Sequence, residues 1–441
     1  MEQLRRPLDH MAQKFFWAAN TVLNESQGNN SNVIVSPFAG TVLATMWYLA
    51  ANGKAERQLD QLLGYQALFE GRAEPKNIQM AFREALKTFC RTSSNDSEEA
   101  RNGHLDASAT PFQLILRNHL FIQPNSGVKA QFIETVRKYL SVDSEEVDFF
   151  QRSCGRKEMT KWLTEQAGAL DLTKIPPVAM DGLFEGNRMT TMSLAYYRGS
   201  WEIPFDPALT SRQPFHLEDG TTKDVEMMTL TEKFPFYEDE AGGLLYIEIP
   251  YYRNGGSLVL TMPVKKGISV QMQHMDQKTF TNLHMRKRMK LTKLTLPKIN
   301  AQCSFELERL FHLVGIREVI HDQSDLSHMT EDPLFRLSEG LVTCAIQIDE
   351  SGSFINGQQP SPPDEKPPPP PPVEPTKAWT AVFTKIAAVS ALSAAAKPSA
   401  NKSDPAVPAG CAVFNANRPF FIGVRHNKTS ALLFAGSYVS P

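Results

Sequence analysis

The densest group of chemically active side chains in this 441-residue sequence is a run of cations in the stretch HMRKRMKLTK. Closely spaced ammonium and guanidinium groups add up to one local positive potential, which attracts phosphate or sulfate groups. The run therefore favours a site for a heparin-like polyanion. The alternative is a solvated strand face, which uses the same residue types. The five residues are Arg286, Lys287, Arg288, Lys290 and Lys293.

No enzyme motif accompanies this run. The sequence has no G-x-S-x-G elbow, no H-E-x-x-H pair, no P-loop and no G-x-G-x-x-G turn. It therefore lacks the spacings that place a nucleophile, a zinc ion or a nucleotide phosphate. Its ten histidines are dispersed, and its five cysteines form neither a disulfide framework nor a zinc pattern. We expect no catalytic residue, no metal and no cofactor.

The charge balance and the apolar runs limit the partners and the compartment. The formal net charge is −2, so nothing favours nucleic acid or an anionic membrane. No apolar run reaches the roughly 18 residues of a transmembrane helix, and no signal peptide is visible. Five N-x-S/T sequons argue instead for export and glycosylation. They begin at Asn24, Asn29, Asn95, Asn401 and Asn427.

The elements that must position these residues fall into helical and strand regions. Residues 1–175 read mostly as helices, and residues 190–300 hold short alternating runs bounded by Gly, Pro and Asn, which indicate antiparallel strands. Because helices and strands are segregated rather than alternating, we predict an α+β fold. The first helix is predicted to be amphipathic, with an apolar stripe of Met11, Phe15, Phe16, Ala19 and Val22.

Five sequence blocks stand in a fixed order along the chain. They are NVIVSP, YYRGSWEIPFDPALTSRQPF, IEIPYYRNGGSLVLTMP, LTLPKINAQCSFELERLFHLVGI followed by SDLSHM, and RPFFIGVRHNKTSALLFAGSYVSP. In this order they resemble the serpin family over nearly all of residues 8–441. The second block matches the family pattern F-K-G-x-W-x-x-x-F…T…F through Gly199, Trp201, Phe205, Thr210 and Phe215.

The resemblance implies a single serpin domain over residues 1–441, with three β-sheets surrounded by about nine helices. An exposed reactive-centre loop would be enlarged and Pro-rich over residues 354–411. Inhibitory serpins are suicide substrates: a serine protease attacks a bait bond, the loop inserts into the main sheet, and the protease is trapped. The family habit therefore implies a protease partner, a monomer and an extracellular location; without a signal peptide, a cytoplasmic location stays open.

The hinge of the loop departs from the family pattern. Glu350, Gly352 and Ser353 match the family's Glu, Gly and Thr, whereas Ile355 stands where alanine is usual. A bulky side chain forced into a packed sheet costs roughly 1–3 kcal/mol. Prolines begin at Pro360. Because proline has no N–H for a central strand, insertion should stop there.

The family's main sheet opens over a polar cluster, which we call the gate. The matching positions here are Ala39, Leu194 and Val342, and all three are apolar. Replacing a whole hydrogen-bonded cluster with apolar groups can be nearly neutral. We therefore expect a gate that is packed shut. The alternative is drift, or a misalignment by one residue.

Two lysines are candidates for the bait residue. Counting forward from the hinge, as in the family, gives Lys366 followed by Pro367. Counting back from the strand after the loop gives Lys402 followed by Ser403. We favour the bond between Lys402 and Ser403, because trypsin-like proteases cleave poorly before proline.

The two counts differ by 36 residues (402 − 366). Removing residues 354–389 would bring the small-residue run SALSAAAK next to the hinge. That segment is therefore either a genuine spacer or a gene-model artefact, and we favour the spacer.

Two functions follow from the resemblance and its departures. The first is inhibition of trypsin-like serine endopeptidases through the reactive-centre loop. The second is a non-inhibitory serpin, which acts as a binding, carrier or interaction protein through its Pro-rich loop. The family favours the first, whereas the hinge and the gate favour the second.

Overall fold

The computed structural model describes residues 2–27, 31–69, 74–90, 112–150, 152–167, 188–264, 277–320, 324–332, 335, 340–353 and 410–441. Residues 1–360 and 412–441 form one compact unit, and residues 361–411 form the other unit into which the chain divides. Of the loop expected over 354–411, only residues 410 and 411 are described. The single domain with an enlarged loop therefore stays a prediction.

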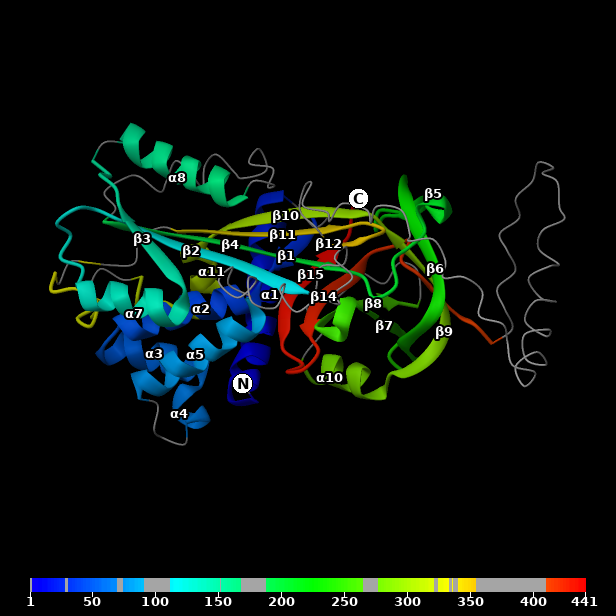
Figure 1. The fold of residues 1–441 in the computed structure, drawn as a ribbon, viewed down its shortest axis with the longest axis horizontal. Helices are drawn as coiled ribbons and strands as arrows, with labels where there is room; N and C mark the ends of the chain where they lie inside the picture. The colour runs from blue at the N-terminus through cyan, green and yellow to red at the C-terminus, as the bar shows by residue number, and fades with distance from the viewer. Residues whose placement is uncertain are drawn as a thin grey trace, which may run out of the picture. The chain divides into compact units, whose positions relative to one another are not determined.

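Helices dominate the first part of the chain, as expected (Figure 1). The described α-helices are α1 (Glu2–Gln27), α2 (Pro37–Ala50), α3 (Gly53–Leu63), α4 (Tyr65–Leu68), α5 (Pro75–Phe89), α7 (Ala130–Leu140), α8 (Arg152–Ala167), α10 (Gln277–Arg286) and α11 (Leu307–Val314). None of them is both long enough and apolar enough to cross a bilayer.

Local sequence explains where the central helices begin and end. Ser36 caps α2, because its Oγ accepts a hydrogen bond from the Ala39 N–H at 3.3 Å, and proline follows at the first helical position. Gly64 ends α3 in the left-handed conformation that glycine adopts at low cost. The predicted apolar stripe of α1 is confirmed, since all five of its side chains are buried.

The strands follow the helices in two hydrogen-bonded networks. In chain order they are β1 (Val33–Val35), β2 (Gln113–Ile122), β3 (Val142–Glu146), β4 (Met189–Ser200), β5 (Ser211–His216), β6 (Thr222–Asp239), β7 (Leu244–Pro250), β8 (Gly256–Pro263), β9 (Arg288–Pro297), β10 (Ile299–Glu306), β11 (Gly340–Ile348), β12 (Gly352–Ser353), β13 (Ala412–Asn415), β14 (Phe420–His426) and β15 (Leu432–Tyr438).

A six-stranded sheet has the order β10-β11-β4-β2-β3, with β12 on β4, and a nine-stranded network holds the other strands. Two of the three expected sheets are joined in that network, because the 18 residues of β6 pair with β5 and β9 and then, through the last four residues, with β7. The α+β prediction is confirmed.

The six-stranded sheet is covered on both faces. Figure 1 shows α8 on one face and α2, α5 and α7 on the other. Successive side chains of a strand point to opposite faces. Accordingly, Met192, Leu194 and Tyr196 of β4 pack in a cluster with α8, whereas Ala195 and Tyr197 belong to the main core with α2. We call these the α8 face and the core face.

The two ends of the described chain meet in the nine-stranded network. The short strand β1 pairs only with β15 among the described strands, and Val33 lies opposite Ser437. Asn32 extends this contact, because its Oδ1 accepts hydrogen bonds from the Val439 N–H at 2.7 Å and the Ser440 N–H at 3.0 Å. The first strand is therefore completed by residues near the C-terminus.

Candidate functional site at the hinge and the gate

The site expected from the sequence lies where β11 and β4 run side by side. Residues Gly340–Cys344 of β11 pair in parallel with Thr191–Ala195 of β4, and no described strand lies between them. Beyond this stretch, the two-residue strand β12 pairs antiparallel with the end of β4. The chain turns back after β11, so a strand that continued from β12 into the space between β11 and β4 would run antiparallel to both. The observed direction of β12 matches this.

A tight turn connects β11 to β12. The Asp349 carboxylate accepts hydrogen bonds from the Ser351 N–H at 2.8 Å and the Gly352 N–H at 3.2 Å. The Asp349 N–H donates to the Gly352 carbonyl at 2.9 Å, which closes the turn. Trp201, from the family block identified in the sequence, donates its indole N–H to the Asp349 carbonyl at 2.9 Å. The turn is thus held in place on both sides.

Glu350 is anchored at the base of this turn. Its Oε1 accepts a hydrogen bond from the Thr210 hydroxyl at 2.7 Å and lies 3.0 Å from the Lys298 ammonium. Partial burial acts to raise the pKa of Glu350, but these two contacts outweigh it and lower the pKa. The carboxylate is therefore charged at neutral pH and ties the hinge to the neighbouring strands.

Gly352 and Ser353 lie where only small residues fit. Gly352 has φ of +153°, and an added Cβ would come 2.1 Å from the Gly199 carbonyl oxygen. Ser353 is fully buried, and its hydroxyl lies 2.7 Å from the Tyr251 hydroxyl. The hinge positions expected from the sequence are thus brought together against β4.

The register of β12 shows which residues would follow. Gly352 lies opposite Ser200 and Ser353 opposite Gly199. If this register continued, residue 355 would face Tyr197, residue 357 would face Ala195, and residue 360 would face Met192. Pairing from residue 357 onward would require β11 to separate from β4, because Ala195 is paired with Cys344. Ile355, Lys366, Pro367, Lys402 and Ser403 lie outside the described residues.

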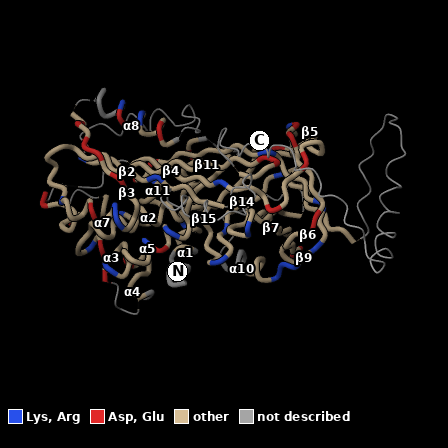
Figure 2. The backbone as a smooth tube through the Cα atoms, in the orientation of Figure 1, with Lys and Arg blue, Asp and Glu red and all other residues tan. Residues whose placement is uncertain are grey.

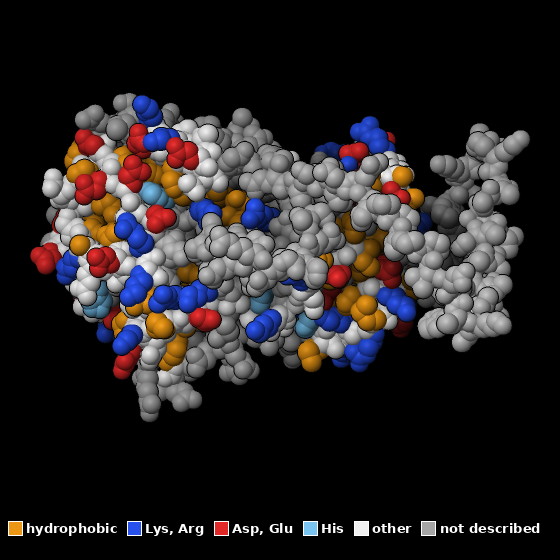
Figure 3. All heavy atoms as spheres, viewed as in Figure 1, with side chains coloured by type: hydrophobic (Ala, Val, Ile, Leu, Met, Phe, Trp, Pro, Cys, Tyr) orange, Lys and Arg blue, Asp and Glu red, His pale blue; other side chains and the backbone are white. Residues whose placement is uncertain are grey.

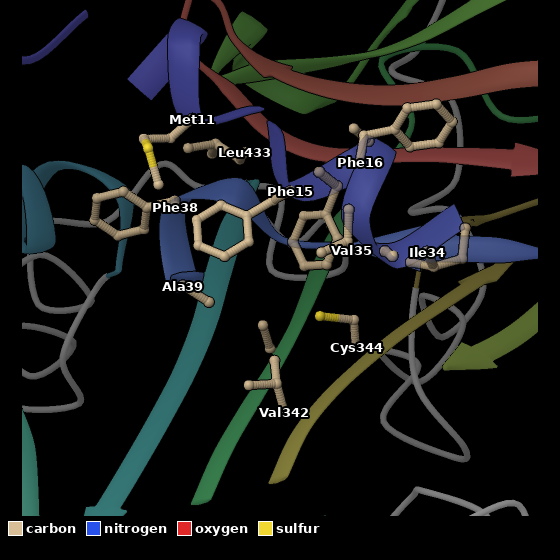
Figure 4. Packing of buried hydrophobic residues seen from close by; sticks show 14 of the residues in the cluster. Met11, Phe15, Phe16, Ile34, Val35, Phe38, Ala39, Val342, Cys344 and Leu433 are labelled. Carbon is tan, nitrogen blue, oxygen red and sulfur yellow. The ribbon is translucent and has the colours of Figure 1, made fainter. Parts of the chain in front are cut away.

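The structure corrects one of the three gate positions. Ala39 and Val342 are both buried in the main core, within the cluster shown in Figure 4. Leu194 packs in the other cluster, on the α8 face of the sheet. The residue directly opposite Val342 on β4 is Ser193. The alignment was therefore displaced by one residue, which moves a strand side chain to the opposite face.

With Ser193 in place of Leu194, the gate keeps a polar pair. The Ser193 hydroxyl donates to Asn118 Oδ1 across β4 and β2 at 2.7 Å, and both side chains are buried. A fully apolar gate was therefore the wrong expectation. Asn118 was missed because it lies on a strand about 75 residues upstream, at an ordinary polar position in an apolar run.

The cations of the run HMRKRMKLTK do not all face the solvent. Lys287 turns inward, and its ammonium lies 2.6 Å from Glu248 Oε2. His284 Nδ1 and Arg425 Nη1 approach the same carboxylate at 2.7 and 3.0 Å, and Tyr246 donates its hydroxyl to it. Burial acts to raise the pKa of Glu248, but the hydrogen bond with His284 and the charges of Arg425 and Lys287 prevail and lower it to about 2. Lys287 therefore belongs to the cluster around Glu248.

The other cations of the run are more accessible. Arg286, Arg288 and Lys290 are exposed, whereas Lys293 is half-buried. Figure 2 shows basic residues along α10 and β9, the elements that carry these cations. We call Arg286, Arg288 and Lys290 the β9 patch.

Comparison with known proteins agrees with this architecture. The model of the serpin (serine protease inhibitor) family matches residues 12–441. A leukocyte elastase inhibitor of Xenopus laevis is 24% identical over 458 residues, which cover all of both chains. Alpha-1-antiproteinase S of Cavia porcellus is 25% identical over 80% of each chain.

Solved structures share the fold at lower identity. Human thyroxine-binding globulin complexed with thyroxine has a TM-score of 0.74 and 18% identity, with 100% of this chain and 99% of the other covered. Uncleaved ovalbumin has a TM-score of 0.73 and 18% identity, with 98% and 100% covered. The chain belongs to the serpin family.

Proposed function

We propose that this serpin offers its loop to trypsin-like serine proteases and that cleavage is not followed by complete insertion of the loop. One observation carries the proposal: β12 pairs antiparallel with the end of β4, in a register that would bring Pro360 opposite Met192 if the pairing continued. The loop therefore starts from a position suited to insertion and reaches a residue that cannot join a central strand.

The first steps of insertion are the easier ones. Residues 354–356 could follow β12 without separating β11 from β4. Ile355 would face the core beside Tyr197, however, and overpacking there costs roughly 1–3 kcal/mol. The next steps must break the pairing of Gly340–Cys344 with Thr191–Ala195. Pro360 then offers no N–H in return. Insertion is expected to stall before the protease is distorted.

The cleaved bond is proposed to be Lys402–Ser403, with Lys366–Pro367 as the alternative. A basic residue followed by serine suits a trypsin-like protease, whereas proline after the cleaved bond does not. Mass spectrometry of the products would locate the bond.

Incubation with trypsin tests the whole proposal. We expect cleavage in the loop, no SDS-resistant complex, and no rise in the melting temperature of the cleaved protein. A covalent band of high mass would refute the stalled insertion. Resistance of the loop to trypsin-like proteases would refute the protease-directed function itself.

A second candidate is a non-inhibitory binding protein whose loop serves as an interaction arm. The apolar pair Ala39 and Val342 favours it, because apolar side chains at two of the three gate positions leave fewer polar groups to exchange hydrogen bonds during opening. The Pro-rich tract at 367–372 favours an extended, stiff segment of the kind that partner proteins bind. A pull-down with the isolated tract would test this candidate.

The β9 patch is proposed to bind a heparin-like polyanion. Native protease nexin-1 with heparin is among the structures that share this fold, with a TM-score of 0.73, 17% identity, and coverage of 98% of this chain and 99% of the other. Substituting Arg288 with glutamine should weaken heparin binding, whereas Lys287→Gln should leave binding nearly unchanged, because Lys287 is engaged by Glu248. Equal losses in the two variants would contradict the division of the run.

We further propose an extracellular, monomeric protein that has no nucleic-acid partner, with the cytoplasm as the alternative compartment. The five sequons support export. Expression in a secreting cell line followed by glycosidase treatment would test this, since an unchanged mass would argue against glycosylation.

A further inference from the structure

A cavity of about 500 Å³ lies away from the hinge and the β9 patch. Its walls come from α5, β2, α7, β3 and α8. The cavity exists because β3 pairs with β2 only from Asn118 to Ile122. Residues Gln113–Arg117 of β2 have no strand neighbour on that edge among the described strands. The described strands therefore leave this part of the sheet edge unpaired.

The walls of this cavity are strongly basic. Five cationic side chains line it against a single carboxylate, that of Asp143. Arg137 lies 4.0 Å from that carboxylate. For the other four, no carboxylate of the described part of the chain comes within ion-pair distance. The five cations are Arg83, Lys87, Arg117, Arg137 and Lys138. Figure 3 shows Lys and Arg side chains over α5 and α7.

Asn118 supplies a second, independent observation. It lines the cavity and is only 3% exposed. Its Oδ1 is occupied, because it accepts the hydrogen bond from Ser193. Its Nδ2 is buried and has no hydrogen-bond partner among the described residues. An unsatisfied buried donor costs about 1–3 kcal/mol, so an acceptor from a ligand would be stabilising there.

The remaining walls are apolar or aromatic. Leu86, Leu116 and Trp162 line the cavity together with the ring of Tyr139. Ligand sites of roughly 300–1,000 Å³ commonly combine such surfaces with a few polar groups that orient the ligand. The cavity therefore suits a compact molecule whose body contacts the apolar wall and whose charged groups reach the cations.

We propose that this cavity binds a small organic molecule that carries two or more phosphate or sulfate groups. The cations compensate several negative charges, the Asn118 amide donates to one oxygen, and the volume admits a small molecule rather than a long chain. A long polysaccharide would instead lie on the surface, where the β9 patch would contribute as well.

Calorimetric titration of the full chain with inositol hexakisphosphate and with sucrose octasulfate tests the proposal. The double substitution Arg83→Gln and Lys87→Gln should weaken binding at least about tenfold, since it removes two charges from the cavity. Glutamine keeps the helix propensity of α5. The matched control, Arg288→Gln with Lys290→Gln, makes the same charge change in the β9 patch and should alter the Kd by less than about twofold.

Asn118→Asp is the second variant. A carboxylate beside the bound anion should weaken binding by at least about tenfold, and circular dichroism would confirm that the variant is folded. If it fails to fold, the double variants still decide the question. Tighter binding of the phosphate probe would indicate a phosphorylated metabolite, and tighter binding of the sulfate probe a sulfated sugar. Equal losses in both double variants, or no binding at about 1 mM of either probe, would overturn the proposal.

Discussion

Substituting Gly352 with alanine probes whether β12 really pairs with β4. The added Cβ would lie 2.1 Å from the Gly199 carbonyl oxygen, and the φ of +153° disfavours any residue with a side chain. Strain of this kind costs about 1–3 kcal/mol. Detachment of the hinge relieves that strain, but it leaves the buried Tyr251 hydroxyl without Ser353, which also costs about 1–3 kcal/mol. We expect detachment, because the clash involves backbone that cannot turn away.

Proteolysis after Glu350 reports that detachment. In the native hinge, the Glu350 side chain is held by Thr210 and Lys298 and is 14% exposed. A cost of about 1.4 kcal/mol raises the open population tenfold, so a Glu-specific protease should cut after Glu350 about ten to a hundred times faster in the variant. Mass spectrometry would separate this cut from cuts elsewhere in the loop.

Gly220→Ala is the matched control. Gly220 also has a positive φ, of +83°, but an added Cβ there meets nothing within 4 Å. It therefore shares the backbone strain without the clash, and cleavage after Glu350 should not change. An unchanged cleavage rate in folded Gly352→Ala would refute the pairing of β12 with β4, and with it the register that brings Pro360 opposite Met192.

Three further predictions follow from the same structure. Replacing Ile355 and the prolines at 360, 362 and 363 with alanine should let insertion proceed as far as Pro367, seen as a higher melting temperature of the trypsin-cleaved protein; an unchanged melting temperature would contradict the stalled-insertion argument. Glu248→Gln should cost about 3–5 kcal/mol in urea unfolding at neutral pH, since buried cations lose their counter-charge. The pKa of Glu248 is lowered from 4.5 to about 2, so its contribution is full above pH 4.5 and is lost as the pH falls to about 2; a gap between wild type and variant that persists at pH 2 would be inconsistent with this. Ser193→Ala should lower the free energy of unfolding by about 1–3 kcal/mol, because Asn118 loses a buried partner; no change would mean that the pair is absent.

The hinge residues named from the sequence lie at positions where local contacts restrict the residue type. Gly352 tolerates no Cβ, and Glu350 is the acid that Lys298 and Thr210 hold. Each constraint acts on a single position. A sequence motif that keeps the glycine and the glutamate therefore indicates where these residues lie in the structure.

The gate could be predicted only in part. Ala39 and Val342 both lie in the main core cluster, whereas Leu194 packs on the opposite face of the sheet and Ser193 stands opposite Val342. Strand β4 is buried on both faces, so its sequence lacks the polar and apolar alternation that would show which side chains face the core. Only the pairing of Val342 with Ser193 decides which side chain faces the core.

The inward turn of Lys287 and the basic cavity could not be predicted. Every cation in HMRKRMKLTK looks alike in sequence, and the partner of Lys287 is Glu248 on another strand. The cavity draws its walls from five elements that the chain visits at widely separated points. Its charge excess exists only after folding has placed those elements together.

The pairing of β1 with β15 has a consequence for synthesis on the ribosome. Val33 cannot pair until Ser437 has been synthesised, 404 residues later (437 − 33). At about 5–20 residues per second, translation leaves the first strand without its partner for roughly 20–80 s. During that interval the unpaired backbone edge and the apolar side chains of β1 are accessible to chaperones and to other nascent chains. Loss of residues 435–441 would remove the residues that pair with β1, so a truncation of this length should be cleared by quality control rather than tolerated as a trimmed tail.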